Sequence, residues 1–234
     1  MTVFVAGFTQ TSESWTSVLD ARPDGEGAGS VDLAIFPTLP SAASFREAAD
    51  ALAVRPGPYV GYSQGGRLCL QLALDRPDVV ERLVLVSASP GIADDDARAA
   101  RRAADDALAR EIQRDGVDAF LDRWLAQPMF ATLAPERAGL DARRASSTVE
   151  GLTQQLRVLG QGAQPSNWER LAELTMPVML IVGERDDQYV EIGHAMGHAI
   201  PDARLEVVAD AGHACHLEQP GLVHQLLRSF GALG

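Results

Sequence analysis

Residues 58–68 read Pro-Tyr-Val-Gly-Tyr-Ser-Gln-Gly-Gly-Arg-Leu, and this stretch decides the fold. Its centre, Gly-Tyr-Ser-Gln-Gly at 61–65, fits the G-x-S-x-G pattern of a nucleophile elbow. In that turn a strand bends sharply into a helix, and Ser63 sits at the apex in a strained conformation that exposes its hydroxyl. Side chains two positions to either side would collide, so Gly61 and Gly65 remove them.

The residues around the motif agree with this interpretation. A short apolar run precedes it, and an amphipathic helical run, 67–74, follows and stops before Pro77. G-x-S-x-G alone also fits an ordinary glycine-rich turn, and the flanking runs favour the elbow. The amides that open the following helix, Gln64 first, would face the space in front of Ser63, where negative charge can develop.

Composition limits the classes of protein. The 234 residues carry 46% hydrophobic and 22% charged side chains, as expected for one large globular domain. A net charge of −12 argues against nucleic acid or an anionic membrane as partner, because either needs a basic face. An anionic substrate would need a local cluster of arginines.

Cysteine usage and the amino-terminal residues predict a cytoplasmic location. Cys69 and Cys215 have no CxxC spacing and no disulfide framework, which suits a reducing compartment. Residues 1–6 run into a strand-like segment without a basic region, and no apolar run approaches the length of a membrane span.

Strand-like runs alternate with helical patterns, which predicts an α/β fold with a mostly parallel sheet of about six strands and helices on both faces. The expected strands are 2–6, 31–36, 59–62, 82–86, 177–182 and 204–208. The expected helices start near Ser12 or Ser14, where Trp15 and Leu19 share a face, and occupy 44–53 (with Ser41 as N-cap), 67–74, 168–174, 190–200 and 222–230.

Residues 92–162 differ in composition from the rest. They are rich in Ala, Arg, Asp, Leu and Gln, without a clear strand. About four helices are expected here, broken near Gly116, Pro128, Gly139 and Gly151, with the acidic run 94–96 at the first helix start. We therefore predict a core of 1–91 and 163–234, and a helical cap of 92–162 over the strand ends.

A serine hydroxyl needs an imidazole to take its proton and a carboxylate to hold that imidazole. On an elbow fold these follow the serine in the order acid, then histidine. Asp186 follows the fifth expected strand, and His213 follows the sixth, so both lie at the carboxyl ends of strands. Asp186 is the predicted acid and Asp187 its rival, because pattern alone does not separate neighbours.

Other ionisable residues near these positions have simpler interpretations. Glu184 and Asp210 are expected at the surface or in turns, and His216 is expected to pack or bond locally. His194 and His198 are spaced i, i+4 and could share a metal, but no third ligand lies nearby, so no metal is predicted.

The chain at this point resembles the α/β-hydrolase superfamily over nearly all its length. Within it, the chain is most similar to the 2-succinyl-6-hydroxy-2,4-cyclohexadiene-1-carboxylate (SHCHC) synthase family of menaquinone biosynthesis. The stretches that carry this resemblance are 61–67 (Gly-Tyr-Ser-Gln-Gly-Gly-Arg), 124–130 (Trp-Leu-Ala-Gln-Pro-Met-Phe), 183–186 (Gly-Glu-Arg-Asp) and 211–213 (Ala-Gly-His). The first two together are fairly specific.

The resemblance implies elimination of pyruvate from a small polycarboxylate, with Ser63 made basic by His213 and with no cofactor. It implies that the Phe8 amide joins that of Gln64 in an oxyanion hole. It places substrate-binding side chains at Tyr62, Arg67, Trp124, Arg144, and Arg101 or Arg102. Arginine suits bidentate binding of carboxylates, whereas the alternative for the three cap arginines is a solvated helix face.

The sequence departs from the family pattern in three places. The turn after the first strand usually reads His-Gly-Phe, and here Ala6 replaces the histidine. Gln188 stands where a lysine is common. The usual first hairpin is absent, so 31–36 becomes an edge strand that must be covered, paired with another chain, or belong to a longer protein.

Two rival functions stay open: Ala6 and Gln188 favour the first, and the intact order of the triad argues against the second. A carboxylesterase or C–C bond hydrolase could use the same triad through an acyl-serine intermediate. A non-catalytic binding protein could retain the fold, which a structure with His213 far from both Ser63 and Asp186 would favour.

Overall fold

The computed structural model describes residues 1–21, 33–35 and 44–233. In this part of the chain, strands pair in one parallel sheet of order β2-β1-β3-β4-β5-β6. They are β1 (Val3–Val5), β2 (Leu33–Ile35), β3 (Gly57–Tyr62), β4 (Val80–Val86), β5 (Val178–Gly183) and β6 (Ala203–Val208). The α/β prediction is confirmed, each expected strand is present within two residues at either end, and β2 lies at an edge.

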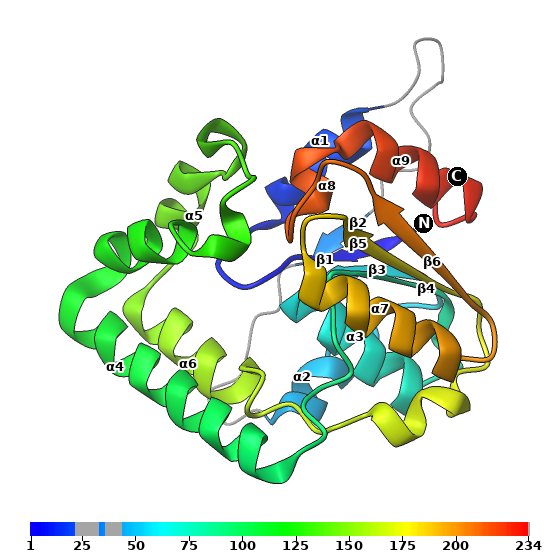
Figure 1. Cartoon of the computed structure of the whole chain (residues 1–234), viewed down its shortest axis with the longest axis horizontal. Coiled ribbons are helices and arrows are strands. Elements are labelled where there is room, and N and C mark those ends of the chain that lie inside the picture. Colours follow the sequence, from blue (N-terminus) through cyan, green and yellow to red (C-terminus); the bar gives the residue numbers. More distant parts are fainter. Residues whose placement is uncertain (22–32, 36–43, 234) are drawn as a thin grey trace.

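Apolar residues on both sides of the strands form two cores, one on each face of the sheet. Successive residues of β1 show the alternation, because Val3 and Val5 join one core and Phe4 joins the other. Figure 1 shows α2, α3 and α7 on one face and α1, α8 and α9 on the other. Such two-sided cover explains the continuous apolar runs of the inner strands.

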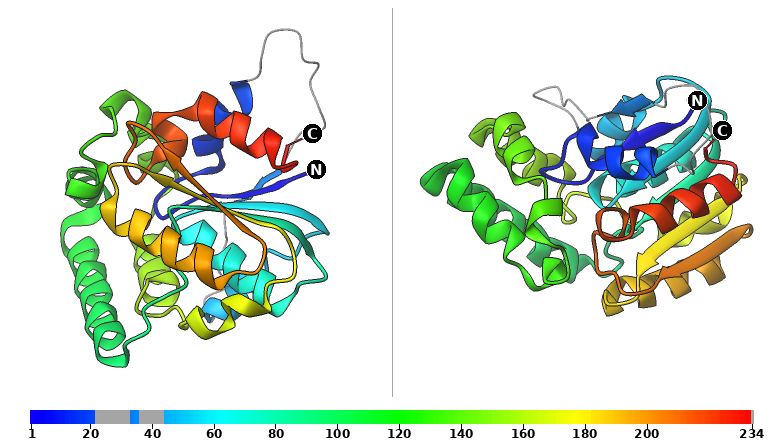
Figure 2. Two further views of the ribbon diagram at one scale, coloured as in Figure 1. Left: turned by 45° about the vertical axis from the view of Figure 1, so that its right-hand side comes forward. Right: turned by 90° about the horizontal axis from the view of Figure 1, so that it is seen from above.

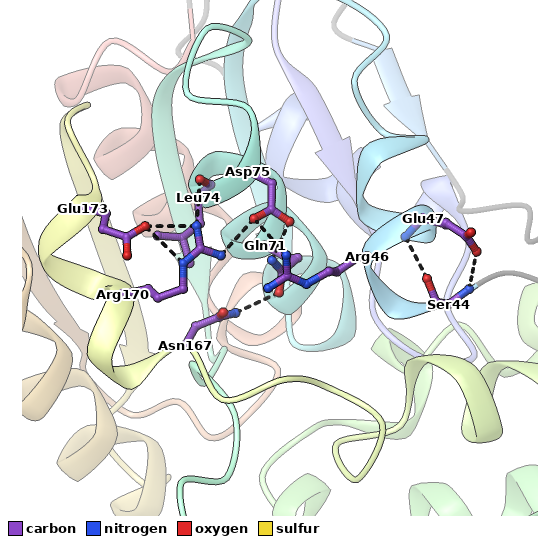
Figure 3. Close-up of polar contacts among 9 residues, drawn as sticks. All are labelled: Ser44, Arg46, Glu47, Gln71, Leu74, Asp75, Asn167, Arg170 and Glu173. Carbon is purple, nitrogen blue, oxygen red and sulfur yellow. Dashed lines mark hydrogen bonds and ion pairs between the residues drawn. The ribbon is translucent and has the colours of Figure 1, made fainter.

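The helices of the two layers depart from the sequence predictions mainly at their starts. They are α1 (Thr16–Asp20), α2 (Phe45–Asp50), α3 (Gln64–Asp75), α7 (Asp187–Ala199), α8 (Cys215–Glu218) and α9 (Pro220–Ser229), with 3-10 helices η1 (Ser12–Trp15) and η4 (Trp168–Glu173). Ser44, rather than Ser41, is the N-cap of α2, because it forms a reciprocal capping box with Glu47 (Figure 3). Ser41 lies outside the described residues.

Segment 92–162, here called the cap, is helical and lies beside the sheet rather than within its layers (Figures 1 and 2). It contains α4 (Asp95–Leu125), α5 (Leu140–Ser146) and α6 (Val149–Leu159), with 3-10 helices η2 (Pro128–Phe130) and η3 (Pro135–Arg137). Helices α4 and α6 pack through a small core of their own, formed by Ala109, Ile112, Phe120, Leu121, Leu152 and Leu156.

The predicted breaks in the cap are correct at three positions and wrong at one. Gly116, at φ 82°, kinks α4, Pro128 opens η2, and Gly139, at φ 64°, precedes α5. The break near Gly151 is wrong, because this glycine lies in the first turn of α6. Thr148 caps that helix, and its hydroxyl accepts a hydrogen bond from the Gly151 amide at 3.0 Å.

A polar network ties the chain returning from the cap to the far end of α3 (Figure 3). Asn167 is fully buried and donates to Gln71, which donates to Asp75. Arg170 bonds Asp75 at 2.8 Å and also pairs with Glu173. Helix α3, which follows Ser63, is therefore anchored at its C-terminal end to the segment that leads from the cap back to the sheet.

Two further predictions concern the chain as a whole. Cys69 and Cys215 are both buried free thiols. Of the helices in the described ranges, none combines the length and apolarity needed to span a membrane.

Candidate active site

Ser63 occupies a strained turn between β3 and α3. Its backbone has φ 48° and ψ −110°, and its amide donates to the carbonyl of Val86 on the neighbouring strand at 2.8 Å. A Cβ on Gly61 would lie 2.6 Å from the carbonyl oxygen of Gly65, and one on Gly65 would lie 2.3 Å from that of Val5. The glycines of the motif thus allow the strand and helix to approach closely.

Asp186 lies in the turn after β5, where its carboxylate faces the catalytic centre. Its carbonyl accepts from the amides of Tyr189 and Val190 at 2.9 Å, so the start of α7 fixes the turn. Asp187 is exposed at the first position of α7 and does not contact the imidazole. Of the two carboxylates, Asp186 is the one that lies within hydrogen-bond distance of the His213 imidazole.

His213 joins the two other side chains in one hydrogen-bonded series. Its Nδ1 lies 2.6 Å from Oδ2 of Asp186, and its Nε2 lies 3.2 Å from Oγ of Ser63. The imidazole is 1% exposed. This arrangement lets the imidazole take a proton from the serine while the carboxylate holds the opposite nitrogen.

The loop that carries His213 is fixed on both sides by close contacts. The Gly212 amide donates to Oε2 of Glu218 at 3.0 Å. A Cβ on Gly183 would lie 2.1 Å from the Gly212 carbonyl oxygen, so the turns after β5 and β6 touch. Glu184 and Asp210 remain at the surface, as predicted, and Glu184 accepts from the Asp210 amide.

Aromatic side chains enclose the imidazole. The rings of Tyr189, Tyr62 and Phe130 lie 4.7, 5.5 and 6.1 Å from that of His213, measured between centroids. The cavity in front of Ser63 has a volume of about 20 Å³, room for about one water molecule. Its lining residues are Phe8, Gln10, Tyr62, Ser63, Trp124, Met129, Phe130, Arg143 and His213.

The two expected oxyanion donors lie at this cavity or beside it. Gln64 is the first residue of α3, and Phe8 follows β1 in a turn closed by the bond from the Gln10 amide to the Gly7 carbonyl. Gly7 makes room for Tyr62, because a Cβ there would lie 2.6 Å from its ring. Gln10 accepts from the Gly7 amide at 3.2 Å and thereby supports the turn in which Ala6 replaces the usual histidine.

Arg67 is buried one turn into α3. Its Nη1 donates to Oε1 of Gln164 at 3.3 Å, and its guanidinium lies 5.9 Å from the centre of the Phe45 ring. Burial lowers the pKa of Arg67 to about 10, so the group remains cationic at neutral pH. Among the described residues, no carboxylate lies within ion-pair distance of it.

The structure corrects the prediction that Arg144 lies in the site. Arg144 is exposed on the cap and pairs with Asp118 and Asp122, at 3.2 and 2.9 Å. Its neighbour Arg143 lines the cavity instead and is only 3% exposed. Consecutive helical residues point about 100° apart, so only one of the pair can face inward.

Arg143 connects the cap to the turn after β1. Its guanidinium donates to the carbonyl of Ala138 at 2.7 Å, to that of Phe8 at 3.5 Å and to the hydroxyl of Thr9. In the described part of the chain these partners are all neutral oxygens. Burial lowers the pKa of Arg143 to about 10.

The remaining predicted cap residues differ in position. Trp124 lines the cavity, where its ring meets that of Phe8 edge-on at 5.1 Å between centroids. Arg101 donates to Asp105 at 2.8 Å and to Gln161. Arg102 is exposed on α4, where its backbone and Cβ pack closely against Gly162. Of the pair left open by the sequence, Arg101 is the one whose guanidinium bonds other cap residues, through a side chain that is 40% exposed.

His216 fills the space behind Tyr62. It is fully buried, with its ring 4.2 Å from that of Tyr62 and 4.8 Å from that of Trp15. Burial lowers its pKa to about 3, so it is neutral at physiological pH. His194 and His198 lie exposed on α7, and the described residues contain no group of three potential metal ligands.

A larger cleft lies on the outer side of Arg143. It has a volume of about 560 Å³ and runs between η1, α1, α5 and the start of α9. Gln10 and Arg143 line both this cleft and the cavity in front of Ser63, so their side chains separate the two spaces.

Known proteins share this architecture. The sequence profile of the alpha/beta hydrolase family matches residues 2–226. A Bacillus subtilis protein whose name proposes a 2-succinyl-6-hydroxy-2,4-cyclohexadiene-1-carboxylate synthase is 34% identical over 97% of this chain and 89% of its own. The structure of MenH from S. aureus superposes with a TM-score of 0.87 at 25% identity, covering 98% of this chain and 92% of that one.

A more distant similarity extends to esterases. A thermophilic esterase from Thermogutta terrifontis superposes with a TM-score of 0.74 at 22% identity, covering all of this chain and 90% of that chain. At this level of identity the similarity concerns the fold alone.

Proposed function

The chain belongs to the α/β-hydrolase family, and from this premise we propose that it is a Ser-His-Asp enzyme that eliminates pyruvate from a polycarboxylate, as an SHCHC synthase does. The relative in Bacillus subtilis, which matches over nearly the whole chain, supports this proposal. The site supports it independently, through its charge.

The observation that carries the proposal is a pair of buried arginines beside the triad without acidic partners. Arg67 and Arg143 are 6% and 3% exposed. Within the described residues, their guanidinium groups donate only to neutral oxygens. A buried, unpaired cation costs several kcal/mol of folding free energy unless an anion completes the site. A substrate with more than one carboxylate supplies such anions, in a chain whose net charge of −12 would otherwise repel it.

The triad supplies the base in this proposal. His213 accepts the hydroxyl proton of Ser63, and Ser63 Oγ takes a proton from a ring carbon of the substrate. The electron pair of that C–H bond first moves onto the adjacent carbonyl as an enolate. Its return forms the new ring double bond and breaks the ring C–O bond, and the imidazolium of His213 protonates the leaving enolpyruvate to give pyruvate. Asp186 stabilises the imidazolium that exists between these events.

Charge that develops on the substrate carbonyl needs donors that are already in place. The amides of Phe8 and Gln64 serve this purpose, and the positive end of α3 adds to their effect. Trp124 offers one more donor, because its buried Nε1 has no partner among the described residues.

The substrate does not fit the closed cavity of about 20 Å³. Its binding therefore requires the cap to shift outward or the lining side chains to rearrange. Because Arg143 and Gln10 separate the cavity from the larger cleft, movement of these two side chains would join the two spaces.

Incubation with the pyruvyl-bearing precursor of SHCHC tests the proposal. We expect pyruvate release by the folded protein, followed with a coupled dehydrogenase, and its loss in Ser63→Ala. Folded protein that releases no pyruvate above background would reject the proposal.

A carboxylesterase or C–C bond hydrolase is the second candidate, favoured by the bond of 3.2 Å between Ser63 and His213, which equally suits formation of an acyl-serine. Rapid turnover of p-nitrophenyl esters, abolished in Ser63→Ala, together with absent pyruvate release would favour it. Inertness toward esters and active-serine probes would count against it.

A further inference from the structure

Tyr189 joins the catalytic histidine to a polar cluster at the other end of its side chain. The tyrosine is buried, and its ring meets that of His213 edge-on at 4.7 Å between centroids. Its amide bonds the Asp186 carbonyl, so the phenol and the acid of the triad share one rigid turn. At the far end, the phenol oxygen accepts a hydrogen bond from Nε2 of Gln161 at 3.0 Å.

Gln161 belongs to the cap and occupies the space between Tyr189 and Arg101. Its amide nitrogen donates to the phenol, and its carbonyl oxygen accepts from Nη1 of Arg101. Arg101 also donates through Nε to Asp105, at 2.8 Å. The amide of Gln161 is thus the contact through which this part of the cap meets the core beside His213.

The backbone of the turn that presents Gln161 is bonded to the carboxylate of Asp105 on α4. Asp105 is 4% exposed and accepts from the Gly162 amide at 3.1 Å. A Cβ on Gly160 would lie 2.4 Å from Oδ2 of Asp105, so the turn is pressed against the carboxylate. The packing of this turn against α4 therefore sets the backbone position of Gln161.

The cluster has more positive charge than negative. Arg101 pairs with Asp105 at 2.8 Å, whereas Arg67, which lies near enough to be influenced by both charges, has no ion-pair partner of its own within the described residues. Within the described residues, the hydroxyl group of Tyr189 has no hydrogen-bond acceptor for its proton. A carboxylate at the position of the Gln161 amide would satisfy Arg101 through charge and accept the phenol proton.

We propose that Gln161 occupies a carboxylate-binding site in the free protein, and that a substrate carboxylate replaces its amide between Arg101 and the hydroxyl of Tyr189. This inference rests on the proposed function for the nature of the substrate. It makes Tyr189 a specificity-determining residue, and it makes Gln161 an internal competitor that leaves when the substrate binds.

Direct binding of 2-succinylbenzoate, the dehydrated aromatic form of SHCHC with two carboxylates, tests this without any turnover. In isothermal titration calorimetry, Tyr189→Phe removes one hydrogen bond to a charged group and should weaken binding about tenfold or more. Gln161→Glu places a permanent carboxylate in the site and should weaken binding at least as much. Gln161→Ala removes the competitor and should bind as tightly as the wild type or more tightly.

Tyr59→Phe is the matched control. Tyr59 is a buried tyrosine whose hydroxyl bonds the carbonyls of Leu52 and Arg55, away from the cluster. It should alter thermal stability and leave the affinity unchanged. Thermal unfolding of each variant shows that it is folded.

The outcomes separate this inference from the proposed function. Equal affinity of Tyr189→Phe and wild type, undiminished binding by Gln161→Glu, a tenfold loss in Gln161→Ala, or no binding by the wild type would each overturn the inference. Pyruvate release is measured separately, so its absence alongside the expected affinities would reject the function and retain the carboxylate site.

Discussion

The core and the cap build the two halves of the site by different means. In the core, Ser63, Asp186 and His213 each follow a parallel strand, and the register of the sheet brings the three turns to one edge. In the cap, Arg143 and Arg101 lie on helices whose placement depends on packing against the core and against each other.

The two halves also differ in what they lack. The side chains of the triad bond one another. Arg143 of the cap lines the cavity in front of Ser63, and Arg67 of the core is buried one turn into α3, each with neutral hydrogen-bond partners only within the described chain. The comparison separates two tasks in our proposal: the sheet positions the residues that carry out the chemistry, and buried arginines that lack an anion bind the substrate.

The largest expected effect comes from breaking the core half. Ser63→Ala or His213→Ala should lower kcat for pyruvate release by on the order of 10⁴ to 10⁶, because neither residue acts without the other. The double variant should be scarcely worse than either single variant. Affinity for 2-succinylbenzoate should persist in Ser63→Ala, and its loss there would contradict the division between chemistry and binding.

Replacing Arg143 tests the cap half. Arg143→Met should raise KM about ten- to a hundredfold, because a charge-assisted bond to the substrate is lost. The same change should leave stability unaltered or raise it, since a buried cation without an anion disappears.

Arg144→Met is the matched control for Arg143. It removes only surface ion pairs with Asp118 and Asp122, so KM and kcat should stay at their wild-type values. A larger kinetic effect at Arg144 than at Arg143 would reverse the assignment of the inward-facing arginine.

His216 is a buried ionisable residue of the core that is held by aromatic packing and needs no ligand. The unfolded chain binds a proton at this histidine below about pH 6.5, whereas the folded protein does not until about pH 3. Stability from this group is therefore full above pH 6.5 and is lost as pH falls toward 3. Between pH 7 and pH 5 the loss is about 2 kcal/mol.

His216→Phe retains an aromatic ring between Trp15 and Tyr62 and should remove this part of the pH dependence in urea unfolding. The exposed residue His194 provides the control, because His194→Asn should keep the wild-type profile. Identical profiles for His216→Phe and the wild type would show that the imidazole is not buried in its neutral form.

The smallest effect is expected where the cap returns to the core. Arg170→Met breaks partly exposed ion pairs with Asp75 and Glu173 and should cost about 1 kcal/mol or less. Its kinetic constants should not change, because Arg170 bonds Asp75 at the last residue of α3, whereas Ser63 precedes the first. A changed KM would show that this anchor controls the cap.

Some predictions from the sequence stay untested. A cytoplasmic location rests on cysteine usage and the amino-terminal residues. Pairing of another chain with the edge strand, predicted at 31–36 and observed as β2 (Leu33–Ile35), also remains a prediction. Analytical ultracentrifugation of the purified protein would test the pairing.

The amino-acid sequence by itself determined the sheet, the elbow, and the order of serine, acid and histidine. Those features rest on local rules: glycines where side chains would collide, apolar runs for buried strands, and loops at strand ends. Because parallel strands meet at one edge, sequence order was enough to place Ser63, Asp186 and His213 together.

Only the tertiary structure decided which cap side chains reach the site. Arg143 and Arg144 are adjacent and chemically identical, and only the rotation of α5 about its axis, about 100° per residue, decides which of them faces inward. Tyr189 and Gln161 carried no motif, and their contact joins residues from separate elements. Packing of helices fixes such choices through many weak contacts spread along the chain, which no short pattern of residues records.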